Sequence, residues 1–170
     1  MTSEEIIRKL SEQFGEKIVE TEPDAYEPAV IVSPGAIADV CSFLKSDPEL
    51  DFKSLMCLSA IDLDEENLRV DYHLYSITRD HKFKLKVIVP KNDPKVPTIS
   101  SVWRTADWHE REAYDLIGVV FENHPDFRRI LLPDDWEGHP LRKDYVVPDT
   151  YREMPVPYPG TERNQKDNRD

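Results

Sequence analysis

The chain has 170 residues, of which 39% are hydrophobic and 33% charged, and its formal net charge at pH 7 is −12. This length suffices for one ordinary domain with a core, and 14 prolines against five glycines indicate extended segments beside it. The acidic charge is concentrated in residues 1–66, no basic stripe could neutralise phosphates, and nucleic-acid binding is therefore disfavoured.

The first predicted element is an amphipathic helix. Thr2, Ser3 and Glu5 have the pattern of a helix start, and Gly15 is the residue type that ends helices. The apolar stripe between them recurs at helical spacing and consists of Ile6, Ile7, Leu10 and Phe14.

Two short strands and a second helix follow. Residues 17–21 and 29–33 are predicted to be strands around a polar connection, and the Ser-Pro pair at 33–34 is typical of a helix start. The Asp-Pro pair at 47–48 stops this helix, whose inward side chains are Ile37, Val40, Phe43 and Leu44.

Three longer strands come next. Residues 54–63 are nearly all apolar, which favours a central strand covered on both faces. Residues 68–77 and the strand after the turn at 78–81 alternate, and Lys82, Lys84 and Lys86 point outward in a manner that suits a sheet edge. The inward residues are Leu68, Val70, Tyr72, Leu74, Phe83, Leu85, Val87 and Val89. The order of elements predicts a single two-layer α+β domain with a mixed or antiparallel sheet flanked by helices.

A third helix precedes the densest part of the sequence. Asp107 and Glu110 have the spacing of a capping box, and Gly118 fits the left-handed position that ends a helix. Asp107, Arg111 and Asp115 recur every four residues, so an ion-pair ladder is expected along one face. Another face gathers Trp103, Ala106, Ala113, Tyr114 and Ile117.

The chain after this helix has no regular period. Turns at 123–126, 133–135 and 137–140 separate two basic clusters, Arg128–Arg129 and Arg142–Lys143. Large aromatic and Arg side chains on irregular backbone are typical of protein–protein interfaces. We therefore expect an α+β domain at 1–122, an extended partner-binding segment at 123–160 and a disordered tail at 161–170, since the Pro-punctuated sequence after residue 145 lacks the apolar surface to fold alone.

Three consecutive motifs carry a resemblance to a known family. They are Glu110-Arg111-Glu112-x-x-Asp115-Leu116-x-Gly118-Val119, then His124-Pro125-x-x-Arg128-Arg129-Ile130-Leu131, then Trp136-Glu137-Gly138-His139-Pro140-Leu141-Arg142-Lys143-Asp144-Tyr145. This run resembles the 30 kDa subunit family of respiratory complex I, and it is dense over residues 103–145. Its length makes it far more specific than a lone short motif.

The resemblance implies a non-catalytic subunit that binds no flavin, cluster or quinone of its own. Such a subunit lies in the peripheral arm, on the cytoplasmic side of the bacterial plasma membrane, against the 49 kDa-like (D) subunit and neighbouring cluster-bearing subunits. The whole complex passes electrons from NADH through FMN and iron–sulfur centres to a quinone and pumps protons. Related membrane-bound hydrogenase complexes contain similar subunits and stay as an alternative.

Other site types fit the residues less well. His109, Glu110 and Glu112, joined by His124, His139 or Asp144, could suggest a metal site, but no His-Glu-x-x-His pattern is present. Glu110 and Glu112 point about 200° apart on a helix, which disfavours an acid–base pair. We expect Glu110 to cap the helix and Glu112 to pair with a basic neighbour.

The basic clusters and the tryptophans allow two interpretations each. Arg128–Arg129 and Arg142–Lys143 could bind a phosphate or a lipid head group, but nearby acids favour local or intersubunit pairing. Trp103 and Trp108 suit core or helix-packing positions, whereas Trp136 in a turn suits an interface anchor.

Cofactor and nucleophile motifs are lacking in the sequence. Cys41 and Cys57 are fewer than the about four thiolates of an iron–sulfur cluster, and their apolar surroundings predict buried free thiols. The small number of cysteines suits a reducing compartment. The acidic residues 1–5 do not resemble a signal peptide, and no apolar run approaches the ~20 residues that span a bilayer.

A scaffold subunit is therefore favoured over a small enzyme with a cryptic carboxylate site. No catalytic, cofactor-binding or metal-binding residue is expected in this chain. The predicted partner-binding residues are Asp107, Glu110, Arg111, Glu112, Asp115, Arg128, Arg129, Trp136, His139, Arg142, Lys143, Asp144 and Tyr145.

Overall fold

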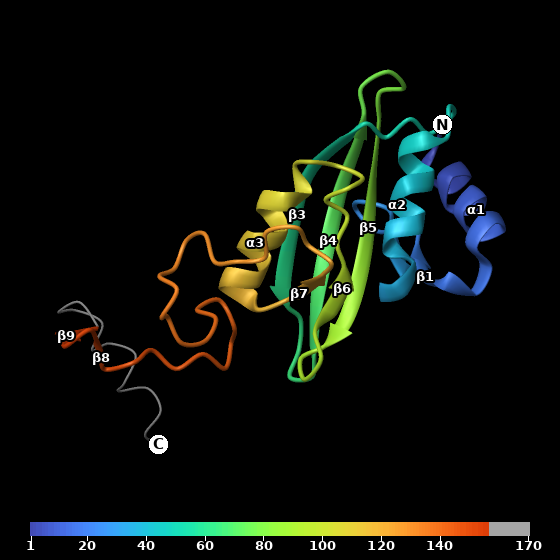
Figure 1. Ribbon diagram of the computed structural model, residues 1–170. Coiled ribbons are helices and arrows are strands. Elements are labelled where there is room, and N and C mark those ends of the chain that lie inside the picture. Colours follow the sequence, from blue (N-terminus) through green and yellow to red (C-terminus); the bar gives the residue numbers. More distant parts are fainter. Residues whose placement is uncertain (157–170) are drawn as a thin grey trace.

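A five-stranded mixed sheet forms the centre of the computed structural model, which describes residues 1–156 (Figure 1). Its strands are β1 (Ile18–Glu22), β2 (Ala29–Val32), β3 (Ser54–Asp62), β4 (Asn67–Ser76) and β5 (His81–Pro90), in the spatial order β1-β2-β5-β4-β3. The β2–β5 pair is parallel and the other pairs are antiparallel. The predicted α+β class with a mixed sheet is confirmed.

Helices α1 (Ser3–Phe14), α2 (Ile37–Ser46) and α3 (Ala106–Ile117) complete the domain (Figure 1). At the start of α1, the Thr2 hydroxyl accepts from the Glu5 amide while the Glu5 carboxylate accepts from the Thr2 amide, so the predicted capping box is present. Gly15 ends α1 with a positive φ of 50° and begins the 3-10 helix η1 (Gly15–Lys17). A second 3-10 helix, η2 (Pro34–Ala36), precedes α2 at the predicted Ser-Pro start.

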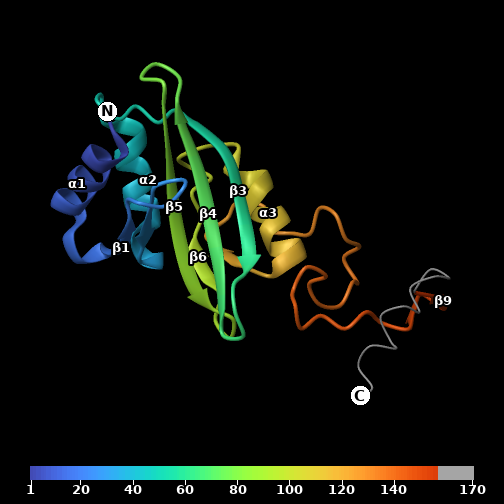
Figure 2. The same ribbon diagram turned by 180° about the vertical axis from the view of Figure 1, so that it is seen from behind.

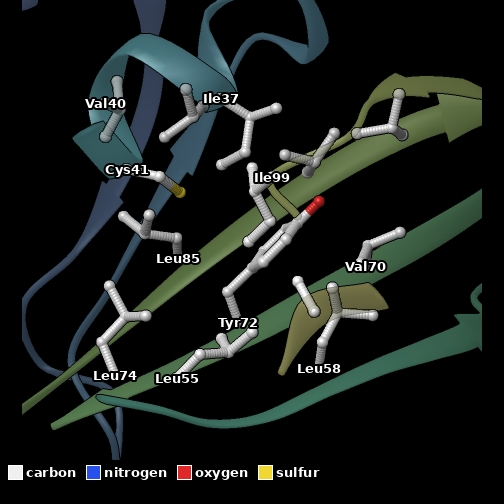
Figure 3. Packing of buried hydrophobic residues seen from close by; sticks show 14 of the residues in the cluster. Ile37, Val40, Cys41, Leu55, Leu58, Val70, Tyr72, Leu74, Leu85 and Ile99 are labelled. Atoms are coloured by element: carbon white, nitrogen blue, oxygen red, sulfur yellow. The ribbon is translucent and has the colours of Figure 1, made fainter. Parts of the chain in front are cut away.

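The hydrophobic core lies on one face of the sheet. The alternating side chains of β4 and β5 that were predicted to point inward are all buried. Ile37, Val40 and Cys41 of α2 face Tyr72, Leu74 and Leu85 across this core (Figure 3). From the opposite side, β3, β4 and β5 are seen with no helix over them (Figure 2). The molecule is thus a two-layer structure with one bare sheet face.

Two strand predictions are wrong. The apolar strand β3 lies at an edge of the sheet, and its Met56, Cys57 and Ile61 side chains are exposed, so β3 is covered on one face only. The lysine-bearing β5 is the middle strand, between β2 and β4, where Lys84 and Lys86 pair with carboxylates instead of protecting an edge. Cys41 is buried as expected, but Cys57 is not.

Two short strands, one before and one after α3 in the sequence, form a second, small sheet. Strand β6 (Lys95–Pro97) pairs in parallel with β7 (Val120–Glu122), which follows α3 directly. Residues 123–149 then form turns and bends without helix or strand, and β8 (Thr150–Tyr151) with β9 (Met154–Pro155) forms a minimal hairpin. The predicted disordered tail at 161–170, and residues 157–160 of the predicted segment, lie outside the described residues.

Candidate partner-binding surface

Three charged side chains of α3 are buried, and they organise the candidate surface. Glu110, Arg111 and Asp115 each have less than a tenth of their surface exposed. Such groups require polar partners when they leave water. These partners come from the loop before the helix and from the irregular segment after it, so α3 connects the domain to residues 123–145.

Glu110 anchors the loop that precedes α3. Its carboxylate accepts hydrogen bonds from the Thr98 hydroxyl and from the Ile99 amide at 2.8 Å. The predicted capping box is therefore wrong: the helix starts at Ala106 with Thr105 in the capping position, and Thr105 makes no side-chain cap bond. Glu110 binds the backbone of a distant loop because it faces the core.

Among residues 1–156, no Lys or Arg side chain lies within 4.0 Å of the Glu110 carboxylate. Burial raises the pKa of this carboxyl from 4.5 to about 7, and the hydrogen bonds from Thr98 and Ile99 only partly offset that effect. The His124 Nε2 atom lies 3.8 Å from the carboxylate, but it donates to the Asp107 carbonyl while Nδ1 accepts from the Asp126 amide. The ring is thus held as the tautomer with its proton on Nε2.

Asp115 is the main attachment point for the irregular segment. One carboxylate oxygen accepts from three consecutive amides, those of Ile130, Leu131 and Leu132, at 3.0, 2.7 and 3.0 Å. The other accepts from Arg129 Nη1 at 2.7 Å. Burial alone would raise the pKa of Asp115, but these four donors lower it below its ordinary value. Asp115 is therefore a buried anion enclosed by a loop.

Arg129 extends this attachment along the segment. Its guanidinium also donates to the Asp115 carbonyl at 3.1 Å and, through Nη2, to the carbonyls of Trp136 and Gly138 at 3.1 and 2.9 Å.

The predicted ion-pair ladder on α3 is only half present. Arg111 Nε lies 3.2 Å from Asp107 as expected, but Nη1 reaches Asp126 at 3.0 Å instead of Asp115.

The carboxyl end of α3 is covered by the third motif, residues 136–145. The Leu141 amide donates to the Leu116 carbonyl at 3.0 Å, His139 Nδ1 donates to the Asp115 carbonyl at 3.1 Å, and Arg142 Nε donates to the Ile117 carbonyl at 2.6 Å. A basic side chain here satisfies free carbonyls and complements the helix dipole. Burial lowers the pKa of His139, which favours its neutral form.

Gly118 makes this close approach of the segment possible. It ends α3 in the predicted left-handed conformation, with φ of 86°. A β-carbon at this position would lie 2.5 Å from His139 Cδ2 and 2.7 Å from Arg142 Nη2. Glycine is therefore required both for its backbone conformation and for the space it leaves.

Lys143 fastens the segment to the far end of β3. Its amide donates to the Asp62 carboxylate at 2.8 Å, and its ammonium donates to the Leu63 carbonyl at 3.1 Å. Lys91 lies 2.7 Å from the same carboxylate. Burial works against ionisation of Asp62, but the Lys91 and Lys143 contacts lower its pKa below the ordinary value.

The remaining predicted residues lie at the periphery. Arg128 pairs with Asp126 at 3.0 Å, Tyr145 packs on Gly138, and Trp136 is half-buried. Glu112 and Asp144 are exposed, and neither has an ion pair within residues 1–156, so the expected pairing of Glu112 is not seen there. The predicted partner-binding set left out Asp62 entirely, and it also left out His124, which was considered as a metal ligand, and Asp126, which was considered only as an acid near the first basic cluster.

The segment presents apolar side chains outward, whereas its half-buried Arg129 and Arg142 point inward onto α3. Large exposed residues on it are Leu131, Leu141, Val146, Val147 and Met154. Trp108 on α3 is 61% exposed, which corrects its expected packing position. Within residues 1–156 no three metal-ligating side chains converge, and no helix there has the length and apolarity needed to cross a membrane. An outward apolar surface on a fixed backbone is suited to binding another protein.

Comparisons with known proteins give a consistent family. The family model described as "Respiratory-chain NADH dehydrogenase, 30 Kd subunit" matches residues 30–151. The C subunit of NADH-quinone oxidoreductase from Chloroherpeton thalassium is 43% identical over 153 residues, which are 89% of this chain and 64% of that protein. The protein of the same name from Geobacter sulfurreducens is 43% identical over 155 residues, covering 89% and 93% of the two chains.

Solved structures share the fold. A chain described as Nqo5 of the trypsin-resistant fragment (1–134) matches with a TM-score of 0.61 at 28% identity, covering 71% of this chain and 98% of that one. A chain of the archaeal membrane-bound sulfane sulfur reductase matches with a TM-score of 0.69 at 23% identity and 85% coverage of both, which is a likeness of fold. This chain spans just under two thirds of the Chloroherpeton relative's length, at 64%.

Proposed function

The chain belongs to the 30 kDa subunit family of respiratory-chain NADH dehydrogenases, and from this we propose that it is a non-catalytic subunit of a proton-translocating NADH:quinone oxidoreductase. Its role is to hold neighbouring subunits of the peripheral arm in place. The name that the relatives share, which assigns them to NADH-quinone oxidoreductase, supports the reaction of the whole complex.

One observation supports the scaffold role: hydrogen bonds of Asp115 on α3, and of Arg129 and Arg142 on the irregular segment, fix that segment to the domain. Asp115, Arg129 and Arg142 together take part in eight hydrogen bonds of 3.5 Å or less that bridge α3 or Gly118 and the segment. Because the backbone is already fixed, the segment loses little backbone conformational entropy when a partner covers its exposed apolar side chains. A preorganised surface of this kind binds more tightly than a mobile tail.

The partner we propose is the 49 kDa-like (D) subunit, together with neighbouring cluster-bearing subunits. In this arrangement the complex carries FMN, iron–sulfur clusters and the quinone site, and the present chain binds none of them. Its location would be the cytoplasmic side of the bacterial plasma membrane, with the attachment to the membrane provided by the rest of the complex.

The first experiment is affinity purification of the chain from its native membranes in mild detergent. We expect NADH:quinone reductase activity, iron and a D-type subunit in the eluate. Partners without NADH activity would instead support a subunit of a related membrane-bound hydrogenase. A lone monomer would contradict the scaffold role and revive the small-enzyme alternative, in which Glu110 and Glu112 would be tested first.

The Arg129→Ala variant tests the surface itself. Removing the guanidinium leaves the buried Asp115 carboxylate without its cation, and breaking a buried ion pair inside a chain by removing one partner destabilises the folded state by about 3–5 kcal/mol, which would release the segment from α3. We expect a large loss of co-purified D-type subunit and of quinone reduction. The matched control is Arg8→Ala, because the Arg8 side chain is 74% exposed and, within residues 1–156, its one ion pair is with Glu12 on α1. Unchanged assembly in Arg129→Ala would refute the role given to this segment.

A further inference from the structure

The face of β3 that α3 does not cover carries more apolar surface than is usual for a solvent-exposed strand face. Its sequence, SLMCLSAID, is apolar on both faces, yet α3 covers only one of them. Met56 is 61% exposed, and Cys57 and Ile61 of the same strand are also exposed. Strands that are apolar on both sides are normally covered on both sides.

This face contains a groove of about 690 Å³ at the end of the sheet where β3 begins. Met56 and Cys57 of β3 line it together with His73 of β4, and Tyr26 from the β1–β2 connection forms part of its wall. The Cys57–His73 and His73–Lys84 register places these side chains in one row across three strands. The groove is therefore built on the sheet and does not depend on a single loop.

The charge of the groove is opposite to that of the chain. Lys82 and Lys84 line it with His73, whereas Glu27 is its one acidic lining residue. Glu27 lies 3.3 Å from Lys84, and Lys82 has no carboxylate within 4.0 Å among residues 1–156. The whole chain has a net charge of −12, so the sign of the charge at this site is opposite to that of the chain. Charge complementarity favours an acidic occupant.

The groove and the surface described above both involve residues of β3. Asp62, the last residue of β3, binds the Lys143 amide, and Ile61 beside it is exposed. Asp62 is five residues after Cys57, which is about 17 Å along the strand at the usual rise per residue.

We propose that this groove is a second subunit-docking site, which receives an apolar side chain flanked by carboxylates from a neighbouring protein of the complex. The proposal rests on the proposed function, because it presumes that the chain works in an assembly. Met56 and Tyr26 would contact the apolar side chain, and Lys82, which has no carboxylate partner among residues 1–156, would pair with a flanking carboxylate.

Cys57 provides a natural reporter of the groove. It is exposed on the bare face, whereas Cys41 is completely buried and serves as the internal control. Labelling with a maleimide, read by mass spectrometry of the Cys57 peptide, would compare the isolated chain with the complex in native membranes. We expect at least about tenfold slower labelling in the complex, and no Cys41 labelling in either folded form.

The Met56→Glu variant tests the chemistry of the occupant. A carboxylate in the groove would repel an acidic partner, so recovery of the complex should fall by about tenfold. Val19→Glu is the matched control, because Val19 is 64% exposed on β1 at the opposite edge of the sheet. The isolated Met56→Glu chain should remain folded, as circular dichroism would verify, since the side chain points into solvent.

Each outcome has a distinct meaning. If the chain co-purifies with the complex but Cys57 labels equally fast in both forms, the groove is open and the inference is wrong. If Cys57 is already protected in the isolated chain and sedimentation shows a dimer, the occupant is a second copy and the inference is again wrong. If the chain is in no complex at all, the proposed function itself fails.

Discussion

Glu110 and Asp115 lie on the same helix, are both inaccessible to water, and have pKa values that move in opposite directions. Burial opposes ionisation of both side chains. Asp115 receives four donors, one of them a guanidinium, whereas Glu110 receives two uncharged donors and faces Asp107. The number and charge of the donors therefore decide which carboxyl stays ionised.

Glu110 makes the stability of the chain depend on pH in a predictable direction. In the unfolded chain its pKa returns to about 4.5, while in the folded chain it is about 7. Between these values the folded state holds a proton that the unfolded state has released. The contribution of Glu110 to the free energy of unfolding is thus complete below about pH 4.5 and is lost as the pH rises through about 7. Its size is about 3 kcal/mol, because each pKa unit of difference corresponds to about 1.36 kcal/mol.

Glu110→Gln tests this linkage. The variant keeps a side-chain carbonyl for Ile99 but cannot ionise, so its free energy of unfolding should fall less than that of the unmodified chain between about pH 5 and about pH 8. The expected difference is up to about 3 kcal/mol. Urea unfolding followed by tryptophan fluorescence measures it, and the other carboxyls cancel in the comparison. Parallel pH profiles of the two proteins would disprove the buried, proton-binding state of Glu110.

At the scale of elements, the boundary between α3 and the irregular segment is fixed by one residue. Gly118→Ala would place a methyl group against His139 and Arg142 and force a non-glycine residue to a φ of 86°. The left-handed conformation alone costs roughly 1–2 kcal/mol. We expect a loss of at least that size in the free energy of unfolding, with faster amide exchange at Leu141, whose bond to Leu116 depends on this contact.

Gly35→Ala is the control for that prediction. Gly35 lies in η2, a β-carbon added to it would meet no atom within 4 Å, and its φ is not positive. Its substitution should change the free energy of unfolding by only a few tenths of a kcal/mol, or raise it slightly by restricting the unfolded chain. Equal effects at the two glycines would show that close packing against Gly118 is unimportant.

The elements differ in how well the sequence specifies them. The capping box of α1 involves residues three apart, and the alternation of β4 and β5 is equally local, so both were predicted correctly. The edge position of β3 depends on which strands pair, and an apolar run looks the same whether a second layer or a separate protein would cover it. The β2–β5 pairing likewise joins strands that are far apart in the sequence.

The predictions at the candidate surface were partly right for the same reason: contacts between residues close in the sequence were predicted, and contacts between distant residues were not. Gly118 was predicted from its place after an amphipathic stretch, and Arg111 was correctly paired with Asp107 four residues earlier. Asp115 has its partners 14 to 17 residues later, in a segment without any period, and Glu110 turns back to Ile99. Long-range pairing of buried charges leaves no repeat in the sequence, so its geometry becomes visible only in the folded chain.

Hydrogen bonds between the domain and residues 123–145 indicate that the folding unit extends beyond the domain. The sequence places a domain boundary at residue 122, which stays a prediction. Asp115 and Asp62 nevertheless receive donors from Ile130, Leu131, Leu132 and Lys143, all beyond that boundary. Removing the segment would leave both carboxylates and the carbonyls at the end of α3 dependent on water.

Chains truncated after Tyr145 and after Glu122 separate the two roles of the segment. We expect the chain ending at Tyr145 to match the full chain within about 0.5 kcal/mol, since the hydrogen bonds to α3 and β3 are retained. The chain ending at Glu122 should lose on the order of 3 kcal/mol, because hydrogen bonds to charged groups contribute about 1.5–3 kcal/mol each and water replaces only part of them. Urea unfolding of the three chains provides the measurement. Equal stability of all three would mean that residues 123–145 serve partner binding alone, whereas the expected order would mean that the same buried charges stabilise the domain and preorganise its docking surface.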